Sequence, residues 1–175
     1  MKPASWVPST GNFEFTVEGT QDAGFTNLEA GYTFLDYGIS ENLSAAVTGR
    51  VGYDRVADTM ELTGEYGMAY STGPWMLYGA AALAYVAPTN NLDGGDFYTT
   101  PTLGAGYAIG ENVSAWGEVE YTWDVSNSFA RQGGELEVGM TFGLADNVAI
   151  EPSIVRTFDT GNDETQARIG LGFWF

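Results

Sequence analysis

The chain contains no histidine and no cysteine, and only 6 of its 175 residues are Lys or Arg. Without histidine, neither a Ser-His-Asp triad nor a histidine-ligated metal site can form. Without cysteine, there is no disulfide and no thiolate. The 23 acidic residues give a formal net charge of −17, and no basic cluster is present to bind nucleic-acid phosphates. We therefore expect no nucleic-acid partner, no cofactor, no dedicated metal site and no enzymatic activity.

Long apolar runs are absent too, since no window reaches the roughly 18 apolar residues that a transmembrane helix requires. Residues 1–10 include Pro3 and Pro8, show no period, and lack the apolar stretch of a secretory signal. We expect an irregular lead-in over 1–10 and a single domain over 11–175. An exported form of the protein would then be a mature chain with an added initiator Met.

Apolar and polar residues alternate over most of the chain from Gly11 onward. In the last segment, Ala167 and Ile169 share one parity, whereas Gln166 and Arg168 share the other. Such alternation is typical of a β-strand with one apolar face and one polar face. No segment shows the 3.6-residue period of a helix. The sequence therefore predicts an all-β protein.

Short polar breaks separate the alternating segments, and one kind of break recurs. The sequence at 39–43 (Ile-Ser-Glu-Asn-Leu) is nearly repeated at 109–113 and again at 144–148, which are spacings of 70 and 35 residues. Such a break predicts a tight hairpin turn in which Asn adopts a positive φ. Regular recurrence of the break indicates one hairpin per repeat.

Tight turns and a second class of longer breaks together separate ten predicted strands. The expected spans are 12–20, 25–37, 43–54, 59–70, 75–86, 97–108, 113–123, 134–143, 148–157 and 164–175. Ten hairpin-connected strands of this length predict a closed up-and-down antiparallel transmembrane β-barrel, with eight strands as the alternative. Pro101 and Pro152 fall inside two of the spans, where each is expected to mark a bulge.

The alternation alone does not say which face points outward. Glycines concentrate on the polar face, as expected where side chains converge inside a narrow barrel. Aromatic residues of the apolar face gather near the strand ends, a distribution that a bilayer selects. These predicted girdles consist of Phe13, Phe34, Tyr53, Tyr70, Trp75, Tyr85, Phe97, Tyr107, Tyr121, Trp123, Phe142 and Phe175. An apolar face that points into lipid is therefore favoured.

The chain ends on Leu171-Gly172-Phe173-Trp174-Phe175, an alternating strand that stops at an aromatic residue. Together with the alternating segments and the Glu-Asn and Asp-Asn turns, this ending resembles the small outer-membrane β-barrels of Gram-negative bacteria. That group includes the OmpA transmembrane domain, OmpX-like proteins and porin-family barrels. Protease, acyl-transfer and lipase barrels of this class rely on histidine, which this chain lacks.

The resemblance implies a location in the bacterial outer membrane, with both termini in the periplasm. It also implies two kinds of partner. The first is outer-membrane lipid, either lipopolysaccharide or phospholipid, for which detergent substitutes in vitro. The second is the barrel-assembly machinery, which would recognise an assembly signal formed by Leu171, Phe173 and Phe175.

The polar face carries many carboxylates and only two basic side chains, Arg50 and Arg168. The expected lumen-lining acids are Glu14, Glu18, Glu29, Glu61, Glu65, Glu118, Glu120, Glu137 and Glu151. Surplus like charges are costly in a dry interior, so we expect a hydrated acidic lumen that prefers cations if it conducts.

Counting residues across the predicted hairpins suggests partners for these charges. Arg50 is expected beside Thr63 and diagonal to Glu61 and Glu65. Closure of the last strand on the first is expected to bring Arg168 near Glu18, and Glu120 is expected directly opposite Glu137.

These patterns leave three functional hypotheses open. The first is a structural barrel or small passive pore of the outer membrane. The second is a surface interaction or adhesion protein that acts through its extracellular loops, and the third is a soluble β-barrel carrier of apolar ligands. The acidic, Gly-containing segments 90–96 and 159–164 are weak candidates for divalent cations, because neither has the spacing of an EF-hand.

Overall fold

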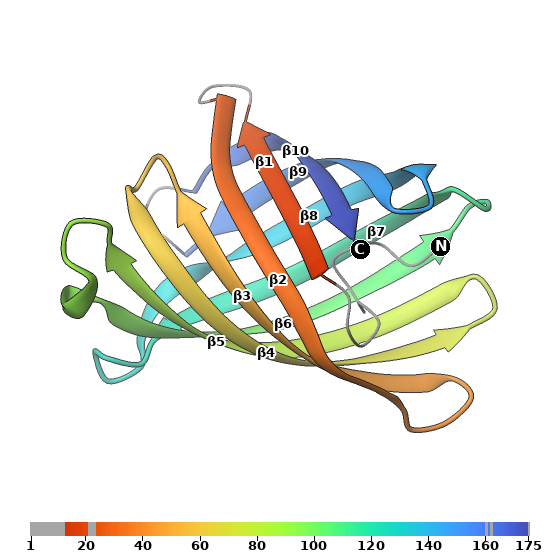
Figure 1. Cartoon of the computed structure of the whole chain (residues 1–175), viewed down its shortest axis with the longest axis horizontal. Coiled ribbons are helices and arrows are strands. Elements are labelled where there is room, and N and C mark those ends of the chain that lie inside the picture. The colour runs from red at the N-terminus through yellow and green to blue at the C-terminus, as the bar shows by residue number, and fades with distance from the viewer. Residues whose placement is uncertain (1–12, 21–23, 160, 162, 175) are drawn as a thin grey trace.

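A computed structural model describes residues 13–20, 24–159, 161 and 163–174, apart from the side chains of Glu14, Thr20, Leu35 and Trp174. Its strands form one closed barrel in which sequence neighbours pair antiparallel and β1 pairs with β10 (Figure 1). This confirms the predicted up-and-down barrel, with ten strands rather than eight. No helix within the described residues is long and apolar enough to cross a membrane.

Within the described residues, seven strands are longer than the predicted spans, β3 has the predicted bounds, and β1 and β10 are shorter. They are β1 Phe13–Thr20, β2 Gly24–Gly38, β3 Leu43–Asp54, β4 Thr59–Thr72, β5 Trp75–Pro88, β6 Asp96–Ala108, β7 Val113–Asp124, β8 Ala130–Ala145, β9 Val148–Phe158 and β10 Thr165–Trp174. A short 3₁₀ helix, η1 Leu92–Gly94, lies in the connection between β5 and β6 and was not predicted.

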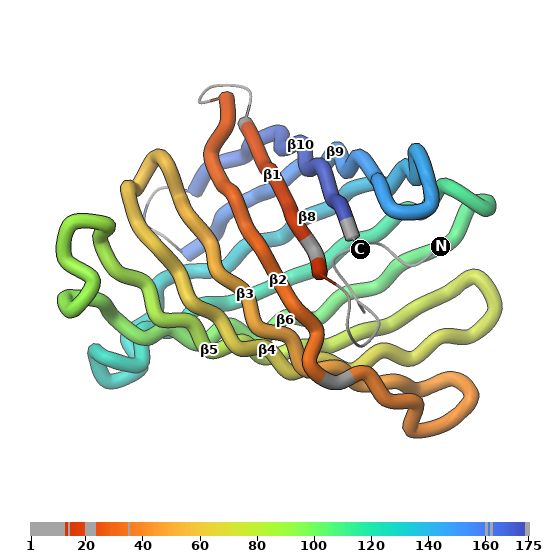
Figure 2. The backbone as a smooth tube through the Cα atoms, in the orientation of Figure 1, coloured from red at the N-terminus to blue at the C-terminus, as the bar shows by residue number. Residues whose placement is uncertain are grey.

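The connections divide between the two ends of the barrel (Figure 2). Four tight turns, at 39–42, 73–74, 109–112 and 146–147, lie at what we call the turn end. The opposite end, the loop end, carries the connections after β1, β3, β5, β7 and β9. Because Glu14 pairs with Trp174, β1 begins and β10 ends at the turn end.

Two copies of the repeated turn have the same hydrogen bonds. The N–H groups of Ile39 and Ser40 donate to Leu43 O at 2.8 and 3.1 Å. Those of Ile109 and Gly110 donate to Val113 O at 2.9 and 3.1 Å. The third copy differs, because β8 continues to Ala145 and leaves only 146–147 in the turn.

The role predicted for the turn asparagines is wrong. None of Asn42, Asn112 and Asn147 is among the described residues with positive φ. Two of them instead attach their turn to a neighbouring strand through the backbone. Asn42 O accepts the N–H of Ser71 at 2.8 Å, and Asn112 O accepts the N–H of Gly143 at 2.8 Å.

The two strand prolines do not cause bulges, contrary to expectation. Register is continuous on both sides of Pro101 in β6 and of Pro152 in β9. Each proline leaves a gap in one ladder because it has no N–H to donate. Side chains bridge the strands beside each gap: Thr100 and Thr122 hydroxyls lie 3.0 Å apart, and Thr141 donates to Glu151 at 2.8 Å.

Apolar side chains cover the outside of the barrel. Leu103, Leu62 and Phe34 are 66%, 60% and 60% exposed. Many inward-facing positions are small or polar, as at Thr33 and Thr63, and larger apolar side chains such as Met76 lie inside near the turn end. This arrangement is the reverse of a soluble carrier with an apolar interior, so that hypothesis does not fit the fold.

Several of the predicted girdle aromatics form cross-strand pairs near the strand ends. Trp75 packs against Tyr107 at the turn end, with ring centroids 4.8 Å apart, and Tyr85 packs against Phe97 at the loop end, at 4.9 Å. Tyr121 and Trp123 lie next to each other on β7, at 4.7 Å. Of the others, Phe13, Phe34 and Tyr70 are exposed and Tyr53 and Phe142 are half-buried, whereas Phe175 lies outside the described residues.

Candidate functional site: the interior of the barrel

The interior contains cavities large enough for water. One, of about 550 Å³, is the loop-side cavity; it is lined by Asn27, Asp54 and Gln166, and it reaches Val56 in the loop after β3. A second cavity of about 210 Å³, the middle cavity, extends down to Tyr78. A third, of about 90 Å³, lies beside it. Since a water molecule occupies roughly 30 Å³ of liquid, each of these spaces has room for water.

Acidic side chains dominate the walls of these three cavities. The carboxylates that line them belong to Glu18, Glu29, Asp54, Glu61, Glu65, Glu118, Glu120, Glu135, Glu137 and Glu151. The basic side chains that line them belong to Arg50 and Arg168. Glu18 contributes to all three cavities, and Glu120 to the two largest.

Arg50 on β3 is held by carboxylates from both neighbouring strands. Its Nε lies 3.3 Å from Glu29 Oε1 on β2. Its two terminal nitrogens donate to Glu65 on β4 at 2.7 and 3.3 Å, a bidentate contact. Arg50 is in register with Thr63, so the predicted position diagonal to Glu65 is confirmed.

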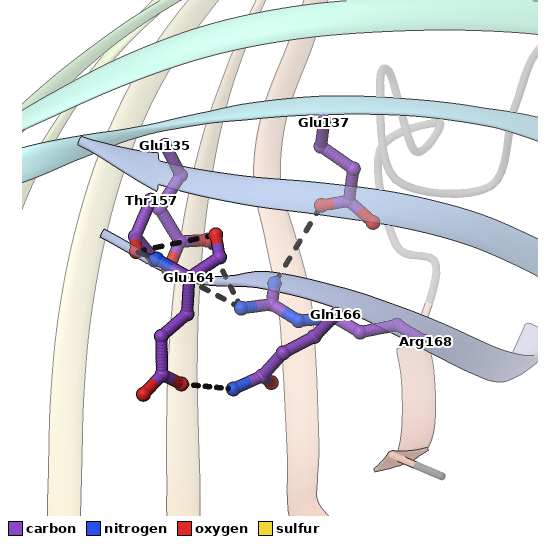
Figure 3. A network of polar contacts seen from close by, with 6 residues as sticks. All are labelled: Glu135, Glu137, Thr157, Glu164, Gln166 and Arg168. Carbon is purple, nitrogen blue, oxygen red and sulfur yellow. Dashed lines mark hydrogen bonds and ion pairs between the residues drawn. The ribbon is translucent and has the colours of Figure 1, made fainter. Parts of the chain in front are cut away.

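Arg168 on β10 reaches across β9 to two carboxylates of β8 (Figure 3). Its Nη2 lies 3.0 Å from Glu135 Oε2, and its Nη1 lies 3.6 Å from Glu137 Oε2. Thr20 stands opposite Arg168 in the ladder and Glu18 lies diagonal to it, and Glu18 and Arg168 line the same cavities, so the predicted proximity is confirmed. The ion pairs of Arg168 are nevertheless made with Glu135 and Glu137, and they tie β10 to β8.

Two pairs of glutamates face each other directly between β7 and β8. Glu118 is in register with Glu137, and Glu120 with Glu135, so the predicted pairing of Glu120 with Glu137 is wrong. The error arose because β8 begins at Ala130, which shortens the loop and shifts the ladder. Glu135 was missed for the same reason, although its shared parity with Glu137 marked it as inward-facing.

Two aromatic residues that the sequence reading overlooked cross the interior near the turn end. Tyr78 on β5 donates a hydrogen bond to Glu118, and its ring lies where a Cβ at Gly104 would be. Trp116 on β7 covers Gly139 in the same way, within 2.7 Å of where a Cβ would stand. The absence of a side chain at these two glycines makes space for the rings.

Near the turn end, aromatic side chains occupy the interior in a layer that we call the floor. Tyr78 and Trp116 are half-buried and pack against Met76 and Ala69, which are 7% and 2% exposed. Farther round the wall, Thr141 is 2% exposed. The middle cavity extends to Tyr78, whereas the loop-side cavity reaches Val56 in the loop after β3.

The remaining predicted acids have less regular surroundings. Glu61 accepts a hydrogen bond from Thr63 in the loop-side cavity, and Glu151 accepts one from Thr141 beside the middle cavity. The side chain of Glu14 lies outside the described part of the structure, although its backbone pairs with Gly31. Among described residues, no group of three or more acidic, His or Cys side chains is arranged to hold a metal ion.

Comparison with known proteins bears on the fold. No family model and no curated protein matches the sequence. Solved structures do match: the KdgM porin has a TM-score of 0.59 at 8% identity, covering 94% of this chain and 98% of that one. The NanC porin has a TM-score of 0.61 at 8% identity, covering 93% and 98%. An outer membrane channel from Pseudomonas putida F1 has 0.58 at 6%, covering all of both chains.

At these identities the likeness concerns the fold alone. The chain has the architecture of outer-membrane porins and channels, a closed antiparallel barrel in which every connection is a hairpin. The likeness does not bear on the side chains that line the interior. Carboxylates in excess over arginines can attract cations and water.

Proposed function

We propose that this chain is a non-enzymatic outer-membrane β-barrel with a hydrated, acidic interior that prefers cations, acting as a structural barrel or a small passive pore. The observation that carries the proposal is the charge of the cavity walls. Far more carboxylates than guanidinium groups line the cavities, and the arginines are already held by Glu29, Glu65, Glu135 and Glu137. Glu18 and Glu120 are therefore left to attract mobile cations.

The outer surface supports a membrane location. Aliphatic side chains such as Leu103 and Ile154 are exposed in mid-strand, and aromatic pairs such as Trp75–Tyr107 lie near the ends. Water would disfavour this surface and a bilayer would favour it. In bacterial barrels of this kind short turns face the periplasm, so the turn end and both termini are assigned to that side.

The preference for cations follows from electrostatics. Two unit charges about 5 Å apart repel by roughly 0.8 kcal/mol in water and by about 3 kcal/mol at an effective dielectric constant of 20. Nearby cations therefore lower the repulsion energy of opposed pairs such as Glu118 and Glu137. One similar structure is a KdgM porin in complex with disordered oligogalacturonate, which is a polyanion. An acidic interior disfavours a polyanion, so we do not propose oligogalacturonate as a solute of this chain.

The floor limits what the barrel can pass. Tyr78 and Trp116 occupy the interior near the turn end, and the loop-side cavity lies toward the other end. A pore of this form has a low conductance that depends on movement of the floor. A barrel whose floor never moves is a structural barrel with a cation-binding vestibule.

The closing strand supports the proposed route of assembly. Leu171 and Ile169 face outward on β10, at 37% and 49% exposure, and Phe173 is half-buried. We propose that Leu171, Phe173 and Phe175 are the signal for the barrel-assembly machinery, and that outer-membrane lipid surrounds the finished barrel. Loop-mediated adhesion has less support, because the longest described connection, 89–95, is short and partly folded into η1.

Reversal-potential measurements test the charge preference. Purified protein is inserted into planar bilayers separating two KCl concentrations, and the sign of the reversal potential reports the preferred ion. Cation preference is expected, and the double variant Glu18→Gln/Glu120→Gln should reduce it because both residues line the two largest cavities. Anion preference in the wild type would overturn the proposal.

A matched control separates local from overall charge. Glu41→Gln/Glu111→Gln removes the same charge from two exposed positions in the turns at 39–42 and 109–112. This control should leave the reversal potential unchanged. If it lowers cation preference as much as the lumen variant does, the interior carboxylates are not the selective element.

A further inference from the structure

A compact group of aromatic and basic residues lies on β7, β8 and β9 near the loop end. We call it the arginine–aromatic patch; it consists of Tyr121, Trp123, Arg131, Arg156 and Phe158. Trp123 is in register with Arg131. The Tyr121 ring lies 4.7 Å from that of Trp123 and 6.0 Å from that of Phe158. The three rings are therefore continuous, with Arg131 on β8 between the two strands that carry them and Arg156 on β9 with Phe158.

The patch lies on the outside of the barrel. Arg156 is in register with Leu136, an outward residue that is 47% exposed. Both arginines are exposed. The ring of Phe158 occupies the place that a Cβ at Gly134 would take, which lays it across β8 toward Tyr121.

Within the described residues, neither arginine of the patch has an ion pair. The ion pairs described above are those of Arg50 and Arg168. Arg55, also at the loop end, donates its Nε to Phe25 O at 2.7 Å, whereas no side-chain hydrogen bond is present at Arg131 or Arg156. Asp159 follows Phe158 and accepts a hydrogen bond from Tyr121 Oη at 3.4 Å. A chain with a net charge of −17 thus presents two unpaired positive charges on one outer face.

The surface below the patch is apolar. Leu136, Val138 and Ile154 continue the same outer face toward mid-strand and are 47%, 50% and 55% exposed. A ligand that contacts both the arginines of the patch and the apolar surface below it needs an anionic group attached to hydrocarbon chains. A soluble anion would satisfy the arginines and leave the apolar surface uncovered.

We propose that the arginine–aromatic patch binds the phosphate of a lipid in the outer leaflet. This inference rests on the proposed membrane location and adds a specific site to it. The planar guanidinium groups of Arg131 and Arg156 match phosphate oxygens in charge and geometry. The rings of Tyr121, Trp123 and Phe158 pack along the interfacial part of the same lipid, where aromatic residues are favoured.

Native mass spectrometry of the folded protein in neutral detergent micelles tests the site. The probe is lipid A with its phosphates, titrated in parallel with dephosphorylated lipid A. The wild type should retain the phosphorylated form preferentially, and R131Q/R156Q should weaken its binding by about tenfold, the effect of losing charge-assisted contacts. Equal binding by R131Q/R156Q and the wild type would overturn the proposal.

Two controls sharpen the result. R55Q removes one loop-end charge outside the patch and should bind as the wild type does; an equal loss in R55Q would mean general attraction rather than a site. Millimolar inorganic phosphate should not displace the lipid, and full displacement would favour a soluble anion.

Folding of each variant is checked by heat-modifiable gel mobility. A wild type that stays folded without detergent contradicts the proposed function, whereas a detergent-dependent, cation-selective barrel with unchanged variants contradicts the patch alone.

Discussion

Replacing Arg168 by Met should destabilise the barrel through β8 rather than through β1. The substitution keeps an aliphatic stem but removes the guanidinium group. Glu135 and Glu137 then lose the only ion pairs that they make with described residues. Each of them also faces another glutamate across the β7–β8 ladder.

The size of the effect follows from the two ion pairs that are lost. Opposite unit charges at 3.0 and 3.6 Å attract by roughly 1 kcal/mol each in water and by about 5 kcal/mol each at an effective dielectric constant of 20, before the cost of desolvation. The side chains of Arg168, Glu135 and Glu137 are 27%, 28% and 17% exposed, which lies between these limits. We expect the free energy of unfolding to fall by about 2 to 3 kcal/mol, less than for a fully buried pair.

Urea unfolding in detergent micelles, followed by tryptophan fluorescence, measures the loss. Adding Glu135→Gln and Glu137→Gln to the variant should recover most of the stability. Arg156→Met is the matched control, and as an exposed, unpaired arginine it should cost less than about 0.5 kcal/mol.

Two results would refute this reasoning. One is an Arg168→Met variant as stable as the wild type, which would mean that water already screens the glutamates. The other is recovery by Glu18→Gln in place of the β8 substitutions, which would mean that Arg168 acts mainly on Glu18 of β1 rather than on the glutamates of β8.

Further predictions concern the floor and the outer face. Tyr78→Ala should raise single-channel conductance in planar bilayers because it removes a ring from the floor, whereas Tyr98→Ala, another inward tyrosine but nearer the loop end, should not. Gly104→Val should displace the Tyr78 ring and lower the free energy of unfolding by about 1 to 3 kcal/mol, as overpacking does; an unchanged urea midpoint would contradict the contact. Leu103→Arg should cost about 2 to 4 kcal/mol in lipid if that position faces the bilayer core, whereas Leu92→Arg in the loop should be neutral. Equal urea midpoints in lipid vesicles for the two leucine variants would contradict the proposed membrane-spanning face.

The fold could be predicted because it depends on features that repeat locally. A period of two and a turn signal at each break determine which segments are strands and that neighbours pair. The hairpin between β3 and β4 was placed correctly, with Arg50 opposite Thr63, because its loop is short and symmetrical. The pairing of Arg50 with Thr63 therefore follows from the local sequence of one hairpin.

The contacts of the interior were harder to predict because small offsets accumulate. The β7–β8 ladder contains a bulge at Thr122 and Trp123, and β8 starts earlier than its alternation suggests. A slip of two residues keeps every side chain on its expected face while changing its partner. Glu120 was therefore correctly expected to face inward but was given the wrong neighbour.

Long side chains add contacts that pairing rules do not contain. Arg168 skips over β9 to reach β8, and Tyr78 on β5 reaches Glu118 on β7 over Gly104. Such contacts depend on the curvature of the closed wall and on where glycine leaves space. Neither is visible in the period of a single strand.

The matching turns at 39–42 and 109–112 have a consequence for how such a barrel can change size. Both turns have the same internal hydrogen bonds. In each turn, one asparagine carbonyl also accepts a hydrogen bond from a neighbouring strand. Because the two turns are equivalent, a hairpin between such turns can be duplicated or deleted as a unit. Each such change adds or removes two strands, and the circumference and inner diameter of the barrel change with the number of strands.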